Sequence, residues 1–216
     1  MSQEVINQET GKNMKSFVVD GYSVIFDILK WISPFRLLQE LLPSLKNNKV
    51  FVDIWVLGNV LFSILSLIVI PTSYLPLIYG CVRLFEVIIV QINLLLFDEY
   101  RDNKDKWPYF ITSFRRTVLL LIHNYLEIIV WFALIYRNFH YFFEIKNLSL
   151  NSVWGSLYFS LVTMTTLGYG DITPKTTMGA FIVIIQTLIG IFMALLLLAR
   201  FVALLPKTKS KDEFEQ

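Results

Sequence analysis

The residues of this sequence that could bind an ion form a short stretch with two glycines around a tyrosine. The stretch reads Thr166-Leu167-Gly168-Tyr169-Gly170, and Asp171 follows it. Glycine accepts backbone angles that residues with a Cβ resist, so successive carbonyls here can point the same way. Such carbonyls, together with a threonine hydroxyl, can replace the water around a potassium ion. The stretch therefore predicts a site for a dehydrated cation.

Apolar segments lie on both sides of this stretch and must position it. A short helix is expected from about residue 152 to 163, and a long apolar helix from about 178 to 205. Non-helical backbone at membrane depth is tolerated only where it is buried in protein or lines a watery path. The stretch is therefore expected to line a pore.

The composition indicates an all-α membrane protein. The 216 residues are 55% hydrophobic, and the mean hydropathy of +0.58 is too high for a soluble domain of this size. Membrane spans are predicted at 50–70, 74–97, 117–136 and 178–205, with a pore helix and filter loop between the last two. The net charge is only +2 and no basic run is interleaved with aromatics, so nucleic acid is not an expected partner.

With these elements in place, residues 166–170 resemble the selectivity filter of the pore-loop potassium channel family. The resemblance covers about residues 117–205 and is strongest from 157 to 174. It is to prokaryotic single-pore members, with an extra helix pair before the pore unit. It implies an ion-binding set of Thr166, Leu167, Gly168, Tyr169 and Gly170, with K⁺ at the carbonyls of the first four and at the Thr166 hydroxyl. It also implies that K⁺ is the permeant ion and that no cofactor is needed.

A single filter cannot enclose an ion, and the chain has one pore loop, so a homotetramer is expected. Membrane lipid is a further expected partner, and a separate regulatory subunit is left open. The family usually has valine or isoleucine where this chain has Leu167, which leaves a weakly selective cation channel as an alternative. A non-conducting sensor or regulatory subunit is the other. No nucleophile–base set, metal cluster or phosphate loop is recognisable in the sequence, so an enzyme is not expected.

The same resemblance implies a set of residues that support the filter. They are Thr165, Asp171, Tyr158, Phe159 and Val162. Many relatives have two tryptophans at the positions of Tyr158 and Phe159, and some bacterial members have a glutamate at that of Val162. Since valine removes this carboxyl group, the hypothesis is that the Tyr158 hydroxyl bonds Asp171 instead.

The last predicted span carries the candidate gate. Gly190 matches a glycine at which the inner helices of relatives bend, and close packing is the alternative reason for a glycine there. The cavity and lower pore are expected to be lined by Ile191, Ala194, Leu198 and Ala199. Leu198 and Val202, one turn apart, are candidates for a hydrophobic constriction.

Three ionisable residues lie inside the predicted spans. Arg83 and Glu86 are three residues apart and can pair on one helix face, and Glu127 has His123 one turn away. Because Arg83 is not followed by further arginines at every third position, a full voltage sensor is not expected. Glu127 is interpreted as a structural partner of Arg83 or as a group that makes gating pH-sensitive.

Charge asymmetry predicts the orientation. Six Lys and Arg residues precede the first span, five lie between residues 98 and 116, and only two lie between 138 and 175. The positive-inside rule then places both termini in the cytoplasm and the filter outside, in the cell membrane. The expected domains are an amphipathic N-terminal segment (1–49), the extra helix pair (50–97), a cytoplasmic linker (98–116), the pore domain (117–205) and a cytoplasmic tail (206–216). The N-terminal segment is expected to lie either in the interface or against the channel's own cytoplasmic face.

Overall fold

The computed structural model describes residues 33–43, 48–96, 114–146 and 148–205, together with residues 21, 24, 25 and 29. These residues belong to two compact units, one drawn from residues 1–43 and 85–109 and the other from 44–84 and 110–216. Most of the N-terminal segment, most of the predicted linker and the tail after residue 205 lie outside the described residues. The domain division therefore stays a prediction.

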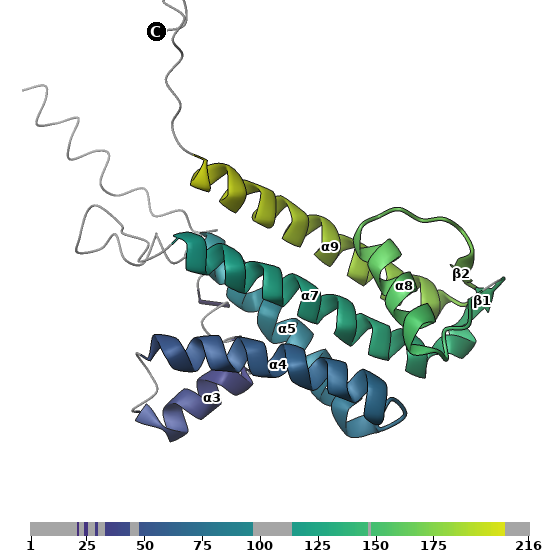
Figure 1. Ribbon diagram of the computed structural model, residues 1–216, viewed down its shortest axis with the longest axis horizontal. Coiled ribbons are helices and arrows are strands. Elements are labelled where there is room, and N and C mark those ends of the chain that lie inside the picture. The colour runs from purple at the N-terminus through teal and green to yellow at the C-terminus, as the bar shows by residue number, and fades with distance from the viewer. Residues whose placement is uncertain are drawn as a thin grey trace, which may run out of the picture. The chain divides into compact units, whose positions relative to one another are not determined.

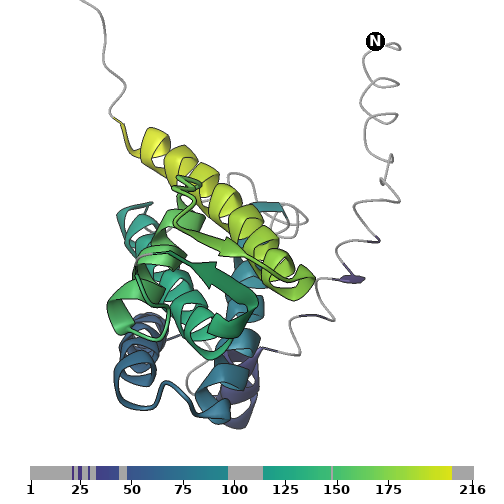
Figure 2. The ribbon, with the colours of Figure 1, turned by 90° about the vertical axis from the view of Figure 1, so that its right-hand side faces the viewer.

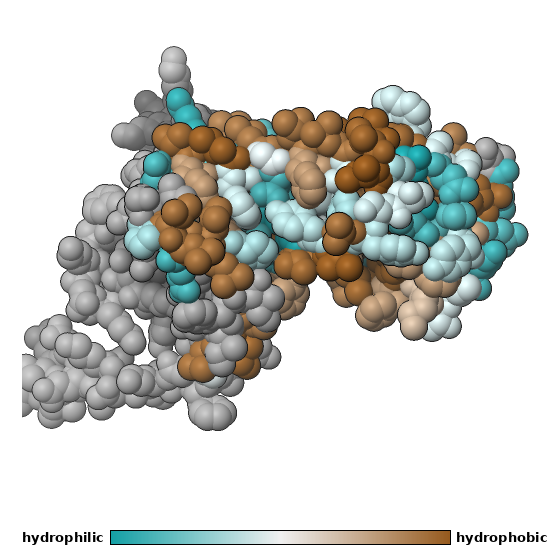
Figure 3. Space-filling view, turned by 90° about the horizontal axis from the view of Figure 1, so that it is seen from below, coloured by the Kyte–Doolittle hydropathy of each residue, from teal (hydrophilic) through white to brown (hydrophobic). Residues whose placement is uncertain are grey.

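In the described part of the chain, four helices are long and apolar enough to cross a membrane. They are α4 (Lys49–Val69), α5 (Tyr74–Leu96), α7 (Phe114–Asn138) and α9 (Thr177–Leu204) (Figure 1). Three of them match the predicted spans to within one residue at each end. On the face drawn in Figure 3, hydrophobic side chains lie along the helices and hydrophilic ones gather at the end that carries the strands. The predicted all-α membrane class is confirmed.

Helix α7 begins earlier than predicted, and the two arginines assigned to the linker belong to its first turn. Arginine is a good helix former, so a charge at the end of a span does not by itself end the helix. Arg116 also gains a partner there, because its guanidinium lies 2.7 Å (Nη2) and 3.0 Å (Nε) from Oδ1 of Asp53. The predicted start of this span, at residue 117, is therefore about one helical turn too late.

Helices α4 and α7 run parallel, side by side (Figure 1). The Asp53–Arg116 ion pair joins them near the ends where both helices begin. At their other ends, Nη1 of Arg137 donates to the carbonyl oxygen of Leu67 at 2.7 Å. Parallel packing is what the first and third of successive spans require, since α5 returns the chain between them.

The core of the second unit lies around α7. Its Tyr136 is fully buried and meets the rings of Phe159 and Phe143 at centroid distances of 4.6 and 5.3 Å. One turn and a half earlier, Trp131 meets Phe62 of α4 at 5.9 Å. Aromatic pairs at these distances add to the stabilisation from burial. Helix α7 is therefore the scaffold on which α4 and the pore elements are placed.

The segment between α7 and α9 contains one more helix and a small sheet. Helix α8 (Val153–Met164) follows an N-cap in which Ser152 Oγ accepts from the Gly155 amide at 2.9 Å. The turn η3 (His140–Phe142) leads into β1 (Phe143–Ile145), which pairs antiparallel with β2 (Ile172–Pro174), Glu144 opposite Thr173. Figure 2 looks at this end, with both strands in front of the helices. The two strands were not predicted from the sequence.

The first unit joins helix α3 (Pro34–Leu41) to the second half of α5. The carboxylate of Glu86 accepts hydrogen bonds from Ser33 Oγ and, at 2.9 Å, from the Phe35 amide, so it caps the start of α3. Glu86 is ten residues, about 15 Å of helix, from the end of α5 at Leu96. The start of α3 thus packs against the second half of α5, and the two placements predicted for the whole N-terminal segment stay predictions.

Candidate functional site

The backbone of the glycine-rich stretch has alternating conformations. Thr166, Gly168 and Gly170 have φ angles of 60°, 58° and 75°, whereas Leu167 and Tyr169 between them do not have positive φ. In an ordinary extended chain successive carbonyls point to opposite sides. A left-handed residue at every second position reverses this alternation and brings the carbonyls to one side. The stretch therefore presents a row of oxygens, as a cation site requires.

The strained position is Thr166, because it has a Cβ and still adopts a positive φ. The amide of Thr166 donates to the Thr163 carbonyl at 3.1 Å, and the Leu167 amide donates to the Val162 carbonyl at 3.0 Å. These bonds tie the start of the stretch to the last turn of α8. The neighbouring Thr165 Oγ1 donates to the Leu161 carbonyl at 2.8 Å and closes the same turn.

The stretch lies on the surface of a single chain. Leu167 is 59% exposed and Tyr169 is 67% exposed, although both are large and apolar or aromatic. Exposed groups of this kind on an otherwise buried scaffold indicate a contact with another surface. The exposed stretch thus indicates a contact with another surface rather than a closed site within one chain.

Tyr158 contacts the two residues on which the support hypothesis depends. Its ring is stacked on that of Tyr169, with centroids 6.4 Å apart and planes 6° apart. Its hydroxyl lies near the Asp171 carboxylate. The hydrogen bond expected between the two groups stays a prediction. Phe159 points away from Tyr158, into the aromatic cluster with Tyr136, and Val162 is buried.

Backbone bonds that were not predicted hold the segment after the filter. The Lys146 amide donates to the Asp171 carbonyl at 3.1 Å, which continues the β1–β2 ladder by one bond. On the other side, the Lys175 amide donates to the Phe142 carbonyl at 2.9 Å. Asp171 Oδ1 accepts from the Ile172 amide at 3.1 Å. The exit of the stretch is thus fixed to the loop that follows α7.

A buried polar cluster fixes α8 between its two neighbours. Nε2 of Gln186, on α9, donates to the carbonyl and to Oγ of Ser160, at 2.9 and 2.8 Å. Ser160 Oγ in turn donates to the Ile129 carbonyl of α7 at 2.7 Å. Both side chains are fully buried. Buried hydrogen bonds of this kind fix one arrangement of the packed helices.

Helix α9 has two different faces. The predicted cavity and gate residues are all exposed in the single chain, namely Ile191, Ala194, Leu198, Ala199 and Val202. Gly190 is instead buried, and a Cβ built on it would lie 2.3 Å from the Met164 carbonyl oxygen. The lack of a side chain at Gly190 therefore allows α9 to pack closely against the end of α8. The hinge stays a prediction.

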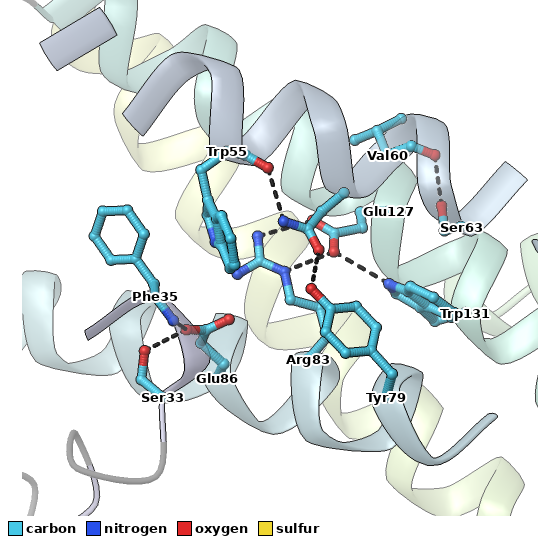
Figure 4. A network of polar contacts seen from close by, with 11 residues as sticks. Ser33, Phe35, Trp55, Val60, Ser63, Tyr79, Arg83, Glu86, Glu127 and Trp131 are labelled. Carbon is cyan, nitrogen blue, oxygen red and sulfur yellow. Dashed lines mark hydrogen bonds and ion pairs between the residues drawn. The ribbon is translucent and has the colours of Figure 1, made fainter. Parts of the chain in front are cut away.

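Figure 4 shows contacts of the intramembrane charges. Arg83 and Glu127 are 4% and 0% exposed and form a two-point ion pair, with Nε–Oε1 at 2.7 Å and Nη2–Oε2 at 3.1 Å. Trp131 Nε1 also donates to Glu127 Oε1 at 3.1 Å, and the Arg83 guanidinium lies 5.9 Å from the ring centroid of Trp55. The predicted pairing of Arg83 with Glu127 is confirmed.

The other two residues named with these charges have partners of their own. Glu86 accepts from Ser33 and the Phe35 amide, as described above. The half-buried His123 contacts its own helix, with Nδ1 2.7 Å from the Leu119 carbonyl oxygen.

Comparison of the sequence with known proteins identifies the family. A family model described as "Ion channel" matches residues 125–207. The chain is 35% identical over 88 residues to "Potassium channel protein kcv" of Paramecium bursaria Chlorella virus 1, a match that covers 38% of this chain and 90% of the viral protein. The chain belongs to the pore-loop potassium channel family.

Two archaeal relatives match over shorter stretches. Both are from Methanocaldococcus jannaschii: a "Hyperpolarization-activated voltage-gated potassium channel", 45% identical over 42 residues, and "Probable potassium channel protein 2", 47% identical over 36 residues. These matches cover 19% and 17% of this chain, but only 20% and 10% of the relatives. No solved structure matches the chain significantly.

Family membership and the four apolar helices make this a multi-pass membrane protein. Members of the family are ion channels and generally assemble as tetramers. Assembly as a tetramer is consistent with the exposure of residues 166–170 on a single chain.

Proposed function

We propose that the chain is one subunit of a homotetrameric K⁺-selective channel that conducts K⁺ passively across the cell membrane. The observation that carries this proposal is the alternation of φ at Thr166, Gly168 and Gly170 within a sequence of filter type. Four such stretches around one axis surround a dehydrated ion with carbonyl oxygens from Thr166 to Tyr169. The names of the viral and archaeal relatives support K⁺ as the ion.

The pore helix contributes to this function through its dipole. Helix α8 ends at Met164, directly before the filter. The carboxyl end of a helix carries roughly half a negative charge. In a tetramer, four such ends point at the central axis and stabilise a cation that waits below the filter. The exposed face of α9, from Ile191 to Val202, lines that cavity.

The proposed orientation follows from the parallel arrangement of α4 and α7 and from charge. Both helices begin at the same side of the membrane, and the lysines and arginines before the first span and between residues 98 and 116 place that side in the cytoplasm. The filter then faces outward. The helix pair within residues 50–97 is an addition to the pore unit of residues 117–205, and its charges anchor it there.

Reversal potentials of the purified channel in lipid bilayers test the proposal. Under opposed K⁺ and Na⁺ gradients, a K⁺-selective pore reverses near the K⁺ equilibrium potential, which moves about 59 mV per tenfold gradient at 25 °C. A reversal near zero in a bi-ionic gradient indicates the weakly selective channel that Leu167 leaves open. A complete lack of current indicates a non-conducting subunit. Gly168→Ala is the matched control, since alanine at a φ of 58° costs about 1–2 kcal/mol in each of four filters and should abolish the current.

Removing the Tyr158 hydroxyl is expected to shorten the conducting life of the filter. Tyr158→Phe keeps the ring that stacks on Tyr169 and removes the hydroxyl that we propose bonds Asp171. A hydrogen bond to a charged group contributes about 1.5–3 kcal/mol, so K⁺ current should decay during sustained opening much faster than in the wild type. Tyr125→Phe, on α7 and away from the filter, is the control. Equal decay in Tyr158→Phe and the wild type rules out this supporting role.

A further inference from the structure

A groove runs between α4 and the first two turns of α5. Its volume is about 610 Å³, and its walls include Phe51, Trp55, Gly58 and Phe62 of α4 together with Leu75 and Tyr79 of α5. All of these residues belong to the second unit. The groove is separate from the filter and from the exposed face of α9, so the proposed conduction of K⁺ does not use it.

Aromatic rings and satisfied polar groups form the floor of the groove. Phe62 meets Tyr79 at 5.3 Å between ring centroids, and Tyr79 meets Trp131 at 5.8 Å. The Tyr79 hydroxyl donates to Asn59 Oδ1, while Asn59 Nδ2 donates to the Trp55 carbonyl at 2.7 Å. The two polar side chains of the floor therefore bond each other and the backbone. Such a floor suits hydrocarbon better than water.

The mouth of the groove is continuous with the surface that α4 and α5 turn toward lipid. Ile54 and Leu75, on opposite walls, are 62% and 80% exposed, and both helices are apolar enough to cross the membrane. The turn at the end of the groove, Pro71-Thr72-Ser73, has no lysine or arginine. None of the residues that line the groove is charged, so an occupant is held by its hydrocarbon rather than by a charged headgroup.

The length and lining of the groove suit an extended alkyl chain. The wall from Phe51 to Phe62 is eleven residues, about 16 Å long, and none of the lining side chains is charged. The helices that flank the groove are long and apolar enough to cross the membrane, so acyl chains of the bilayer reach its mouth. A span of a second copy is the competing occupant, and it would shield Trp55 from lipid.

We propose that this groove binds one acyl chain of a membrane lipid from the leaflet at the α4–α5 turn. Lipid tails are as apolar as leucine, so binding there depends on close packing in the groove rather than on a hydrophobic driving force. Trp55 forms one wall and also lies over the Arg83 guanidinium. A lipid in the groove therefore contacts the residue that covers the intramembrane ion pair.

Tryptophan quenching by brominated lipid tests the proposal on the full-length channel. The channel is reconstituted in vesicles of phosphatidylcholine whose acyl chains are dibrominated near their middle, and the Trp55 signal is taken as the difference between the wild type and Trp55→Phe. A Cβ on Gly58 meets nothing within 4 Å, so Gly58→Phe places a ring in the groove. We expect strong quenching of Trp55 in the wild type and at least a threefold weaker quenching constant in Gly58→Phe.

Leu65→Phe is the matched control, because Leu65 is exposed on the same helix and does not line the groove. It should leave Trp55 quenching unchanged. Gly58→Leu places a smaller side chain in the groove. It is used if size-exclusion chromatography shows that Gly58→Phe does not assemble. Two results overturn the proposal: a Trp55 signal that brominated lipid does not quench, as when a neighbouring subunit covers the groove, or quenching that neither filling variant reduces.

Discussion

Replacing Glu127 by leucine is expected to destabilise the subunit by about 3–5 kcal/mol, the usual cost of breaking one side of a buried ion pair. The variant leaves the Arg83 guanidinium, 4% exposed, without its carboxylate partner. It also removes the acceptor of Trp131 Nε1. Thermal unfolding of the detergent-solubilised channel, followed by circular dichroism, measures the loss.

A double-variant cycle separates the charge from the packing. Arg83→Met alone should be destabilising because it buries the Glu127 carboxylate without a cation, whereas Arg83→Met with Glu127→Leu removes both charges. Replacing a whole buried pair by apolar residues of similar volume is often neutral or stabilising, so the double variant should recover most of the stability lost in either single variant. Losses that simply add would contradict the pairing.

The Asp53–Arg116 pair provides the control for this cycle. Two guanidinium nitrogens again contact the carboxylate, here both closest to Oδ1, but the side chains are 40% and 35% exposed. Surface pairs contribute about 0–1 kcal/mol, so Asp53→Asn should change the unfolding temperature little. If Asp53→Asn and Glu127→Leu were equally harmful, burial would not be the reason for the effect.

The parts of this fold that could be predicted are those determined by short, continuous stretches of sequence. Hydropathy placed α4, α5 and α9 to within a residue because each span is a continuous apolar run. The conformation of residues 166–170 was predictable for a similar reason, since Gly168 and Gly170 mark the positions that need a positive φ. Thr166 shares that conformation without being a glycine. The role proposed for Thr166 rests on the resemblance in sequence rather than on backbone propensity.

The contacts that fix the filter were not predictable, because they join residues far apart in the chain. Gln186 meets Ser160 across 26 positions, and Ser160 meets Ile129 across 31. A glutamine in an apolar run indicates that its side chain needs a polar partner. It does not identify that partner. The strands β1 and β2 are three residues each, too short for a period-two pattern to be recognised.

Replacing Gly190 by alanine is expected to damage conduction through packing. The new Cβ would lie 2.3 Å from the carbonyl oxygen of Met164 and 3.1 Å from its carbonyl carbon. Both are backbone atoms, so no side chain can rotate away, and α9 or the end of α8 must move. Alanine favours a helix over glycine by about 1 kcal/mol, but overpacking a core typically costs about 1–3 kcal/mol. The cost of the clash should therefore exceed the gain in helix propensity.

The same variant distinguishes packing from a hinge, because the two act on different quantities. Met164 is the last residue of α8, and Thr166, two positions later, already forms part of the filter. A shift there should change the current through a single open channel and lower the unfolding temperature. A lost hinge should lower only the fraction of time spent open. Single-channel recording gives both quantities, and Gly58→Ala, whose Cβ meets nothing within 4 Å, is the control. A wild-type unitary current with a lower open probability would favour the hinge. A reduced unitary current would show that Gly190 allows α9 to pack closely against the end of α8.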